Sequence, residues 1–284
     1  MRSSQKKDGQ LRQFAGGAFI LALVCAIGLM FFTRKQPPAP KPPVRPVVVK
    51  PVVKPPPAKV TGYITLILDD WGYNRAHCKQ LAALDAPVVA AVLPGLEYST
   101  DIIQCANASG HEAILHLPIE PHVLHEAYPR GYFLTVAMSS DEVKRSLKRT
   151  LDNMKGVVGV NNHEGSKGTE NLALMMTVLG ELKHRGLFFV DSVTSDKSIC
   201  SEAASRVNIP FTHRDIFIDN RMDRASIERQ IQLAASIARE KGFALVIGHD
   251  RALTLQIVGE QIHKLRQQGY VFLSLRDYIK ARNE

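Results

Sequence analysis

The chain has 284 residues, enough for one large domain or two of ordinary size, and a formal net charge of +9. That charge is concentrated at one end, because residues 1–60 contain eleven Lys and Arg residues and a single acid, Asp8. The rest of the chain is close to neutral and offers no basic stripe, so we expect no nucleic-acid partner.

Residues 14–32 form a run of nineteen residues without a charged side chain. A helix of that length can cross a hydrocarbon core of about 30 Å, and the basic residues before it favour a cytoplasmic amino terminus. A cleaved signal peptide is the alternative, but the run is long for a signal core and no small-residue cleavage site follows it. We therefore expect residues 1–35 to be a basic segment with an uncleaved transmembrane anchor.

Residues 36–59 are dominated by Pro, Val and Lys. Proline at this density prevents helix formation and strand pairing, and it favours extended polyproline II. The segment is expected to be a semi-rigid linker, and a recognition role for its PxxP-like pieces is the weaker alternative. Residues 60–284 are then expected to form the folded domain, on the extracytoplasmic side of the membrane.

The four cysteines of the chain are scattered, with no CxxC motif and no short Cys/His pairing. This pattern argues against both a disulfide scaffold and a zinc finger. Three of the four, Cys78, Cys105 and Cys200, fall in helical patterns of the expected domain. If two of these three pair, at least one thiol stays free.

From residue 60 onwards, apolar strand patterns alternate with helical patterns. The expected strands span residues 64–69, 87–93, 112–117, 157–160, 187–190, 243–247 and 270–273, with short segments at 210–211 and 216–219 that could add to them. The expected helices span residues 76–84, 99–109, 139–154, 172–184, 196–207, 226–241 and 255–268, followed by a short terminal helix. Ser139 and Glu142 fit a capping box, and Ser99 and Thr169 are the predicted caps of two further helices.

Repeating strand–helix units of this length predict an α/β fold with a parallel sheet. We favour an irregular β/α barrel of seven to eight strands over an open, doubly wound sheet. No glycine-rich phosphate loop follows any of the strands, which argues against a nucleotide-binding version of the fold.

Polar side chains suited to metal chemistry gather where the expected strands end. Asp69 and Asp70 close the first strand, and the carboxyl ends of parallel strands share one rim. The other strand-end candidates are His116, Glu120, Asn162, His163, Asp191, Asp219 and His249. Imidazole and carboxylate groups are the usual ligands of an open catalytic zinc site. A single histidine is more often structural, but an ordered set of this kind predicts a metal centre. The remaining histidines receive no role, except that His122 or His125 could line a cleft.

Three short motifs resemble those of the polysaccharide deacetylase superfamily: LDD at 68–70, GHEAILH at 110–116 and IGH at 247–249. Three others resemble its divergent, bacterial-envelope branch: HLPIEP at 116–121, NNHEGS at 161–166 and FVDS at 189–192. The resemblance covers roughly residues 60–280. It implies that Asp69 is the catalytic base, that Asp70 and His116 are metal ligands, and that His249 is the general acid.

The chain departs from the superfamily pattern at Glu120, where a second metal-binding histidine would fall. Glu120 or His163 could complete the site; we favour Asp70, His116 and His163 as the ligands and keep Glu120 in reserve. The arginine-bearing motif of the superfamily has no clear match. Asn162, Asp191 and Asp219 are additional candidates.

By this resemblance the protein is a metal-dependent hydrolase that removes N- or O-acetyl groups from an envelope glycan. The implied cofactor is a divalent metal, with zinc preferred, and the implied substrate is an acetylated polysaccharide or a peptidoglycan-like polymer. The implied location is the bacterial inner membrane, spanned once by residues 14–32, with the domain in the periplasm. The alternatives are an inactive barrel that binds or scaffolds envelope components, and a metal-dependent phosphatase or amidohydrolase.

Overall fold

The computed structural model describes residues 60–124 and 131–283, all within one compact unit that spans 55–284. The expected anchor at 14–32 and the linker at 36–59 lie outside the described residues, as does His125. Within the described part of the chain, no helix is long and apolar enough to cross a membrane.

One parallel sheet carries all nine strands of the described chain. They are β1 (Gly62–Trp71), β2 (Val89–Val92), β3 (Glu112–Ile119), β4 (Gly159–Glu164), β5 (Phe188–Asp191), β6 (Phe211–His213), β7 (Ile216–Phe217), β8 (Phe243–His249) and β9 (Tyr270–Phe272). Their order is β6-β5-β4-β3-β2-β1-β8-β7, and β9 pairs with the first residues of β1. The parallel α/β architecture is thus confirmed.

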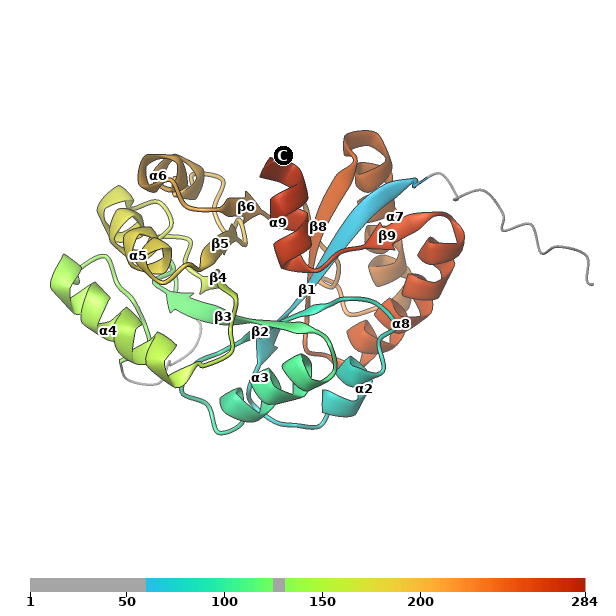
Figure 1. The fold of residues 1–284 in the computed structure, drawn as a ribbon, viewed down its shortest axis with the longest axis horizontal. Helices are drawn as coiled ribbons and strands as arrows, with labels where there is room; N and C mark the ends of the chain where they lie inside the picture. The colour runs from blue at the N-terminus through green and yellow to red at the C-terminus, as the bar shows by residue number, and fades with distance from the viewer. Residues whose placement is uncertain (1–59, 125–130, 284) are drawn as a thin grey trace, which may run out of the picture. The chain divides into compact units, whose positions relative to one another are not determined.

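The sheet curls but does not close, because no ladder joins β6 to β7 among the described strands. Figure 1 shows this curled half-barrel with β1 and β2 near its middle. The expected barrel is therefore confirmed in part, as a curled half-barrel, and the expected seven to eight strands are corrected to nine in the described chain. The two edge strands are only two and three residues long, so they offer little backbone for closing a barrel.

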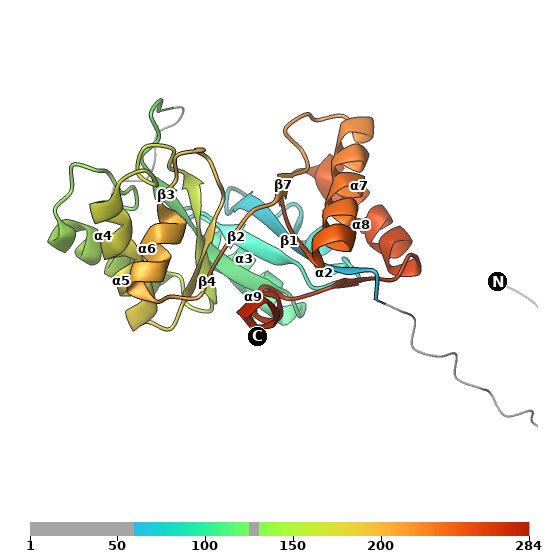
Figure 2. The ribbon, with the colours of Figure 1, turned by 90° about the horizontal axis from the view of Figure 1, so that it is seen from above.

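Helices α2 to α8 of the described chain cover the outer face of the sheet, and α9 lies inside the curl. The bounds are α2 (Cys78–Ala82), α3 (Ser99–Ala108), α4 (Ser140–Asn153), α5 (Leu172–His184), α6 (Cys200–Val207), α7 (Arg224–Lys241), α8 (Ala252–Gln267) and α9 (Leu275–Asn283). Figure 2 shows α4, α5 and α6 grouped at the β3–β6 half, with α7 and α8 side by side at the other half.

Local sequence signals predicted some helix starts and missed others. The capping box of Ser139 and Glu142 is confirmed. Ser99 is not a cap, because it lies inside α3 and its hydroxyl donates to a backbone carbonyl before the helix. Thr169 is also not a cap, because Asn171 caps α5 and the Thr169 hydroxyl donates to a carbonyl in the preceding turn.

Apolar side chains fill both faces of the sheet, as its near-continuous hydrophobic strands require. The larger cluster lies between the sheet and the surrounding helices. The smaller cluster fills the inside of the curl and comprises Ile67, Val89, Ala91, Ile114, Phe188, Val190, Leu245, Ile247, Leu275, Tyr278 and Ile279. The last three belong to α9, which lies across the middle of the sheet in Figure 1.

The start of α9 is tied to the amino-terminal end of β3. The Glu112 carboxylate accepts a hydrogen bond of 2.8 Å from the backbone N–H of Leu275. Along β1, β3 and β8 the inward-facing apolar residues Ile67, Ile114 and Ile247 are each followed two positions later by a polar residue. Because side chains alternate along a strand, these polar residues form the next inward-facing layer, further from α9.

Two glycines test this packing. A Cβ on Gly62 in β1 would lie 2.5 Å from the Ala238 carbonyl oxygen of α7, whereas a Cβ on Gly180 in α5 would meet nothing within 4 Å. We expect Gly62→Ala to lower the free energy of unfolding by about 1–3 kcal/mol, because backbone must move. Gly180→Ala should raise it by about 0.5–1 kcal/mol through helix propensity. Urea unfolding of the two variants measures both, and equal effects would contradict the described contact between α7 and β1.

Candidate metal centre

The two adjacent carboxylates of β1 face the same side of the sheet because the strand is irregular there. The register with β2 shifts between Leu68 and Trp71, and Asp70 has a φ of 66°. A left-handed residue at a bulge breaks the usual alternation, and Asp tolerates that conformation better than most residues. As a result Asp69 Oδ2 lies 3.7 Å and Asp70 Oδ1 lies 3.3 Å from Nε2 of His116.

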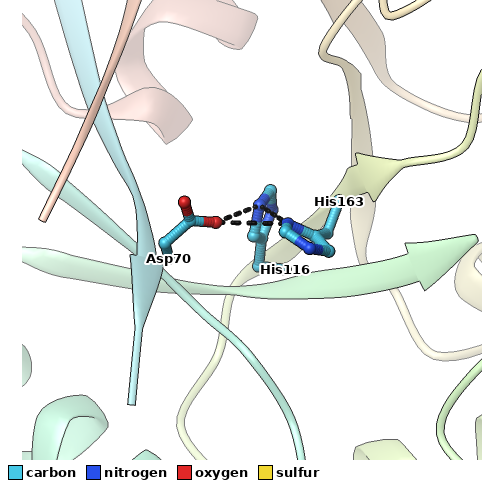
Figure 3. A group of neighbouring side chains, drawn as sticks. All are labelled: Asp70, His116 and His163. Carbon is cyan, nitrogen blue, oxygen red and sulfur yellow. Dashed lines mark hydrogen bonds and ion pairs between the residues drawn. The ribbon is translucent and has the colours of Figure 1, made fainter. Parts of the chain in front are cut away.

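Asp70, His116 and His163 form a group of potential metal ligands contributed by β1, β3 and β4 (Figure 3). His163 Nδ1 lies 3.1 Å from Asp70 Oδ1 and 2.9 Å from His116 Nε2. A tetrahedral ion with bonds of about 2.0–2.2 Å holds its ligand atoms about 3.3–3.6 Å apart, so the three atoms need only small shifts to share one. Two imidazoles and one carboxylate also match the donor types of an open catalytic zinc site.

Asp70 Oδ1 supports this interpretation independently. The atom is buried and makes no well-aligned hydrogen bond, although two imidazole nitrogens lie next to it. Burial alone would raise the pKa of Asp70, but the contacts and charges of His116 and His163 outweigh it and hold that pKa far below its usual range. The carboxylate is therefore anionic and available to a cation. The residues present fit a divalent metal ion.

Asn161 orients the buried parts of the site. It is fully buried on β4, in register with His116 on β3. Its Oδ1 lies 2.8 Å from His116 Nδ1, and its Nδ2 donates a hydrogen bond of 2.9 Å to Asp69 Oδ1. An amide oxygen can only accept, so His116 carries its proton on Nδ1 and presents the lone pair of Nε2 to the cluster. Such a partner fixes both the tautomer and the orientation of a ligating histidine.

Asp69 is buried beside the cluster, with only 2% of its surface exposed. Burial raises the pKa of Asp69, against the opposing charges of His116 and His249. Conversely, burial would lower the pKa of His116, but the Asp69 and Asp70 carboxylates outweigh it and raise that pKa. One oxygen of Asp69 is engaged by Asn161, which leaves Oδ2 directed towards His116.

His249 reaches the same rim from β8, where it is in register with Asp69. Its Nδ1 lies 2.7 Å from Oδ1 of the fully buried Asp219, whose Oδ2 accepts from the His249 backbone N–H and from the Thr254 hydroxyl. Burial would lower the pKa of His249, but the Asp219 contact outweighs it and raises that pKa. His249 Nε2 is thus turned towards the cluster, 4.0 Å from Asp70 Oδ2.

A family model described as divergent polysaccharide deacetylase matches residues 66–279. The chain belongs to this family. The uncharacterized protein YibQ of Escherichia coli (strain K12) is 32% identical over 206 residues, which cover 72% of this chain and 64% of YibQ. The chain thus matches slightly less than two thirds of that relative's length.

Two crystal structures share the fold of this deacetylase family member. The uncharacterized protein ATU2773 from Agrobacterium tumefaciens C58 has a TM-score of 0.71 at 20% identity, covering 78% of this chain and 90% of its own. BA3943, described as a CE4 family pseudoenzyme from Bacillus anthracis, has a TM-score of 0.50 at 13% identity. The match covers 78% of this chain and 66% of the BA3943 chain.

Besides Asp69 and His249, four of the strand-end residues predicted from the sequence lie outside the ligand cluster. Glu120 is engaged elsewhere: Lys167 Nζ donates to its Oε1 at 2.6 Å and the Val136 N–H donates to its Oε2 at 2.7 Å. Asn162 points to the opposite side of β4 from Asn161 and His163, and its Oδ1 accepts a hydrogen bond from the Ser192 N–H.

Asp191 likewise serves its own loop. Its two oxygens accept hydrogen bonds from the Val193 N–H and from the Ser198 hydroxyl. Among the described interactions, none joins Asp219 to a member of the ligand cluster. Asp219 instead accepts a hydrogen bond from His249 and so acts as a positioning residue.

The fold brings to the rim several residues that the sequence patterns did not mark as functional. Asn161 lies in the NNHEGS motif, but the motif predicted no role for it. Arg214 follows β6, donates to two carbonyls of the β5–α6 loop, and lies 3.9 Å above the ring of Phe217, which in turn stacks on His249. His77, which also received no role, has its Nδ1 2.6 Å from Oδ1 of Asp250. No local motif marks these contacts, because their partners are distant in the chain.

The choice between His163 and Glu120 as the third ligand is directly testable. We expect His163→Ala to weaken zinc binding at least about tenfold, because it removes one of three converging donors. Glu120→Gln should leave zinc affinity unchanged, because the carboxylate is bound to Lys167. Calorimetric zinc titrations of the two variants and the wild type provide the measurement. The reverse result would make Glu120 the ligand.

Asn161→Ala tests the orienting role of the amide. Because the tautomer and position of His116 lose their support, we expect zinc affinity to fall by about 10–100-fold while the protein stays folded. Asn107→Ala, which removes a surface amide that donates to the Gly156 carbonyl, is the matched control and should bind zinc normally. Unchanged affinity in Asn161→Ala would show that His116 is positioned by packing alone.

Proposed function

We propose that this protein is a metal-dependent hydrolase that removes acetyl groups from a glycan. The observation that carries the proposal is that two further titratable side chains lie beside the ligand cluster. A buried carboxylate, Asp69, and an imidazole held by a buried carboxylate, His249, both reach the same rim within 4.0 Å of a ligand residue. A site for metal binding alone has no use for a base and an acid in these positions.

A divalent ion held by Asp70, His116 and His163 supplies Lewis acidity, which polarises a carbonyl group and activates water at neutral pH. Asp69 Oδ2 is the oxygen that accepts the proton of the attacking water, because Oδ1 is occupied by Asn161. Burial favours this role, since a raised pKa makes the Asp69 carboxylate a stronger base.

His249 completes the reaction by protonating the leaving group. Its Nδ1–H donates to Asp219, so Nε2 is the nitrogen that faces the rim. The raised pKa of His249 keeps a larger fraction of the imidazole protonated near neutral pH. An amine or alkoxide leaving group needs this proton, because neither departs readily as an anion. The products are acetate and the deacetylated sugar.

Zinc is the metal we propose, on the basis of the two imidazoles and one carboxylate of the cluster. The substrate we propose is an acetylated envelope polysaccharide or a peptidoglycan-like polymer, with N- or O-acetyl groups. This proposal is supported by the family to which the chain belongs. The charge-free run at residues 14–32 and the Pro-rich segment after it support an inner-membrane anchor with the domain in the periplasm.

An inactive, metal-binding module of the envelope is the second candidate. It is favoured by Glu120, which stands where the superfamily carries a further histidine and which is held by Lys167 instead of the cluster. Hydrolysis measurements on the metal-loaded protein separate the two candidates.

Asp69→Asn tests the catalytic step without removing a proposed ligand. With N-acetylglucosamine oligomers and O-acetylated xylan as substrates, we expect wild type loaded with zinc to release acetate. We expect the variant to be about 10²–10⁴-fold slower with its zinc content unchanged. Asp85→Asn, which alters an exposed carboxylate paired with Arg266, is the control and should match wild type. Full activity in Asp69→Asn would disprove the base assignment, and no acetate release from loaded wild type would favour the binding module.

A further inference from the structure

Two cysteine side chains from neighbouring helices meet close to the candidate site. Cys78 is the first residue of α2, and Cys105 lies in α3. The Cys105 thiol is 3.5 Å from the Cys78 carbonyl oxygen, and the two thiols lie within interaction distance of one another. Both side chains are only partly buried, so a small thiol reagent can reach them.

The third cysteine of the described chain differs in each of these respects. Cys200 lies in α6 and is fully buried. Burial raises the pKa of its thiol far above the ordinary value, with the Asp191 charge adding to the effect. Cys200 therefore serves as an internal reference for an unreactive thiol.

We propose that Cys78 and Cys105 form a reversible disulfide that fastens α2 to α3 beside the candidate site. This bond would join two residues 27 positions apart in the chain, and the segment between them includes all of β2. The proposal is independent of the hydrolase activity, since it depends only on the position of the two thiols.

The oxidant is a disulfide of the glutathione class. In the first step the sulfur of Cys105 attacks oxidised glutathione, the glutathione S–S bond breaks, and one glutathione thiol leaves. In the second step the sulfur of Cys78 attacks the mixed disulfide at Cys105 and releases the second glutathione thiol. Two protein thiols are oxidised, one glutathione disulfide is reduced, and the two thiol protons end on the two glutathione molecules.

The order of attack follows from the surroundings of Cys78. Burial raises the pKa of the Cys78 thiol to about 12, and the neighbouring Cys105 and the Asp250 charge add to this rise. Cys78 is therefore a poor first nucleophile near neutral pH. Once Cys105 is joined to glutathione, it no longer raises the pKa of Cys78, and the Cys78 thiol becomes easier to ionise.

The disulfide would restrain a segment that borders the site. His77 directly precedes Cys78 and contacts Asp250, whose backbone N–H donates to the Asp69 carbonyl at 2.9 Å. Asp250 directly follows His249. A bond at Cys78 therefore limits the movement of the chain between β1 and α2, where it contacts the end of β8.

Peptide mapping of the full-length protein tests the proposal. The protein is equilibrated in buffers of graded oxidised and reduced glutathione, once in the folded state and once during refolding from urea so that access is not limiting. Exchange is then quenched with acid, free thiols are alkylated with a maleimide near neutral pH in urea so that buried Cys200 also reacts, and the digest is examined by mass spectrometry. We expect a Cys78–Cys105 linked peptide that dithiothreitol removes, with Cys200 alkylated throughout.

Cys78→Ser and Cys105→Ser are the matched variants, each leaving one thiol of the pair. We expect both to lack the linked peptide and to show no dependence of the Tm on the glutathione ratio. In wild type the Tm should rise by about 5 °C or more on oxidation. Free thiols at both positions after refolding in oxidised glutathione, separate glutathione adducts without a linked peptide, or a link to another cysteine would each overturn the proposal.

Discussion

The arrangement of the candidate site depends on one buried amide. Asn161 accepts from His116 and donates to Asp69, so a single side chain joins a proposed ligand to the proposed base across β4, β3 and β1. A buried carboxylate is costly unless hydrogen bonds and opposite charges compensate it. Asn161 supplies the hydrogen bond, while His249 supplies the positive charge. Removing this link therefore affects metal binding and proton transfer together.

The curled sheet explains why these groups lie in one layer. Apolar side chains of the inward faces pack against α9 at one end of the curl, and the next inward positions carry Asp69, His116 and His249. The in-register pairs Asp69–His249 and His116–Asn161 then place the polar groups at a common height. The bulge at Asp70 adds a second carboxylate that regular alternation would direct to the helices. The fold thus concentrates charge at one rim while the rest of the interior stays apolar.

The sequence predicted most of the strands and helices, because buried parallel strands and amphipathic helices have strong local patterns. It also predicted which residue types would gather at the strand ends. It did not predict that β4 continues through the NNHE stretch, and this continuation separates inward Asn161 and His163 from outward Asn162. Pairings such as Glu120 with Lys167 and His77 with Asp250 depend on long-range packing, which no local pattern encodes. The predicted barrel is confirmed in part, as a curled half-barrel, because its closure would depend on pairing of the two edge strands, which no local pattern encodes.

The central claim is that Asp70, His116 and His163 bind one metal ion, and elemental analysis tests it most directly. The full-length wild type and His116→Ala would be purified side by side, stripped with a chelator, reloaded with zinc and desalted. The account predicts about one equivalent of zinc per wild-type chain and loss of that metal in the variant, with both proteins folded by circular dichroism. Wild type that retains no metal after reloading, or a variant that retains as much as wild type, would contradict it.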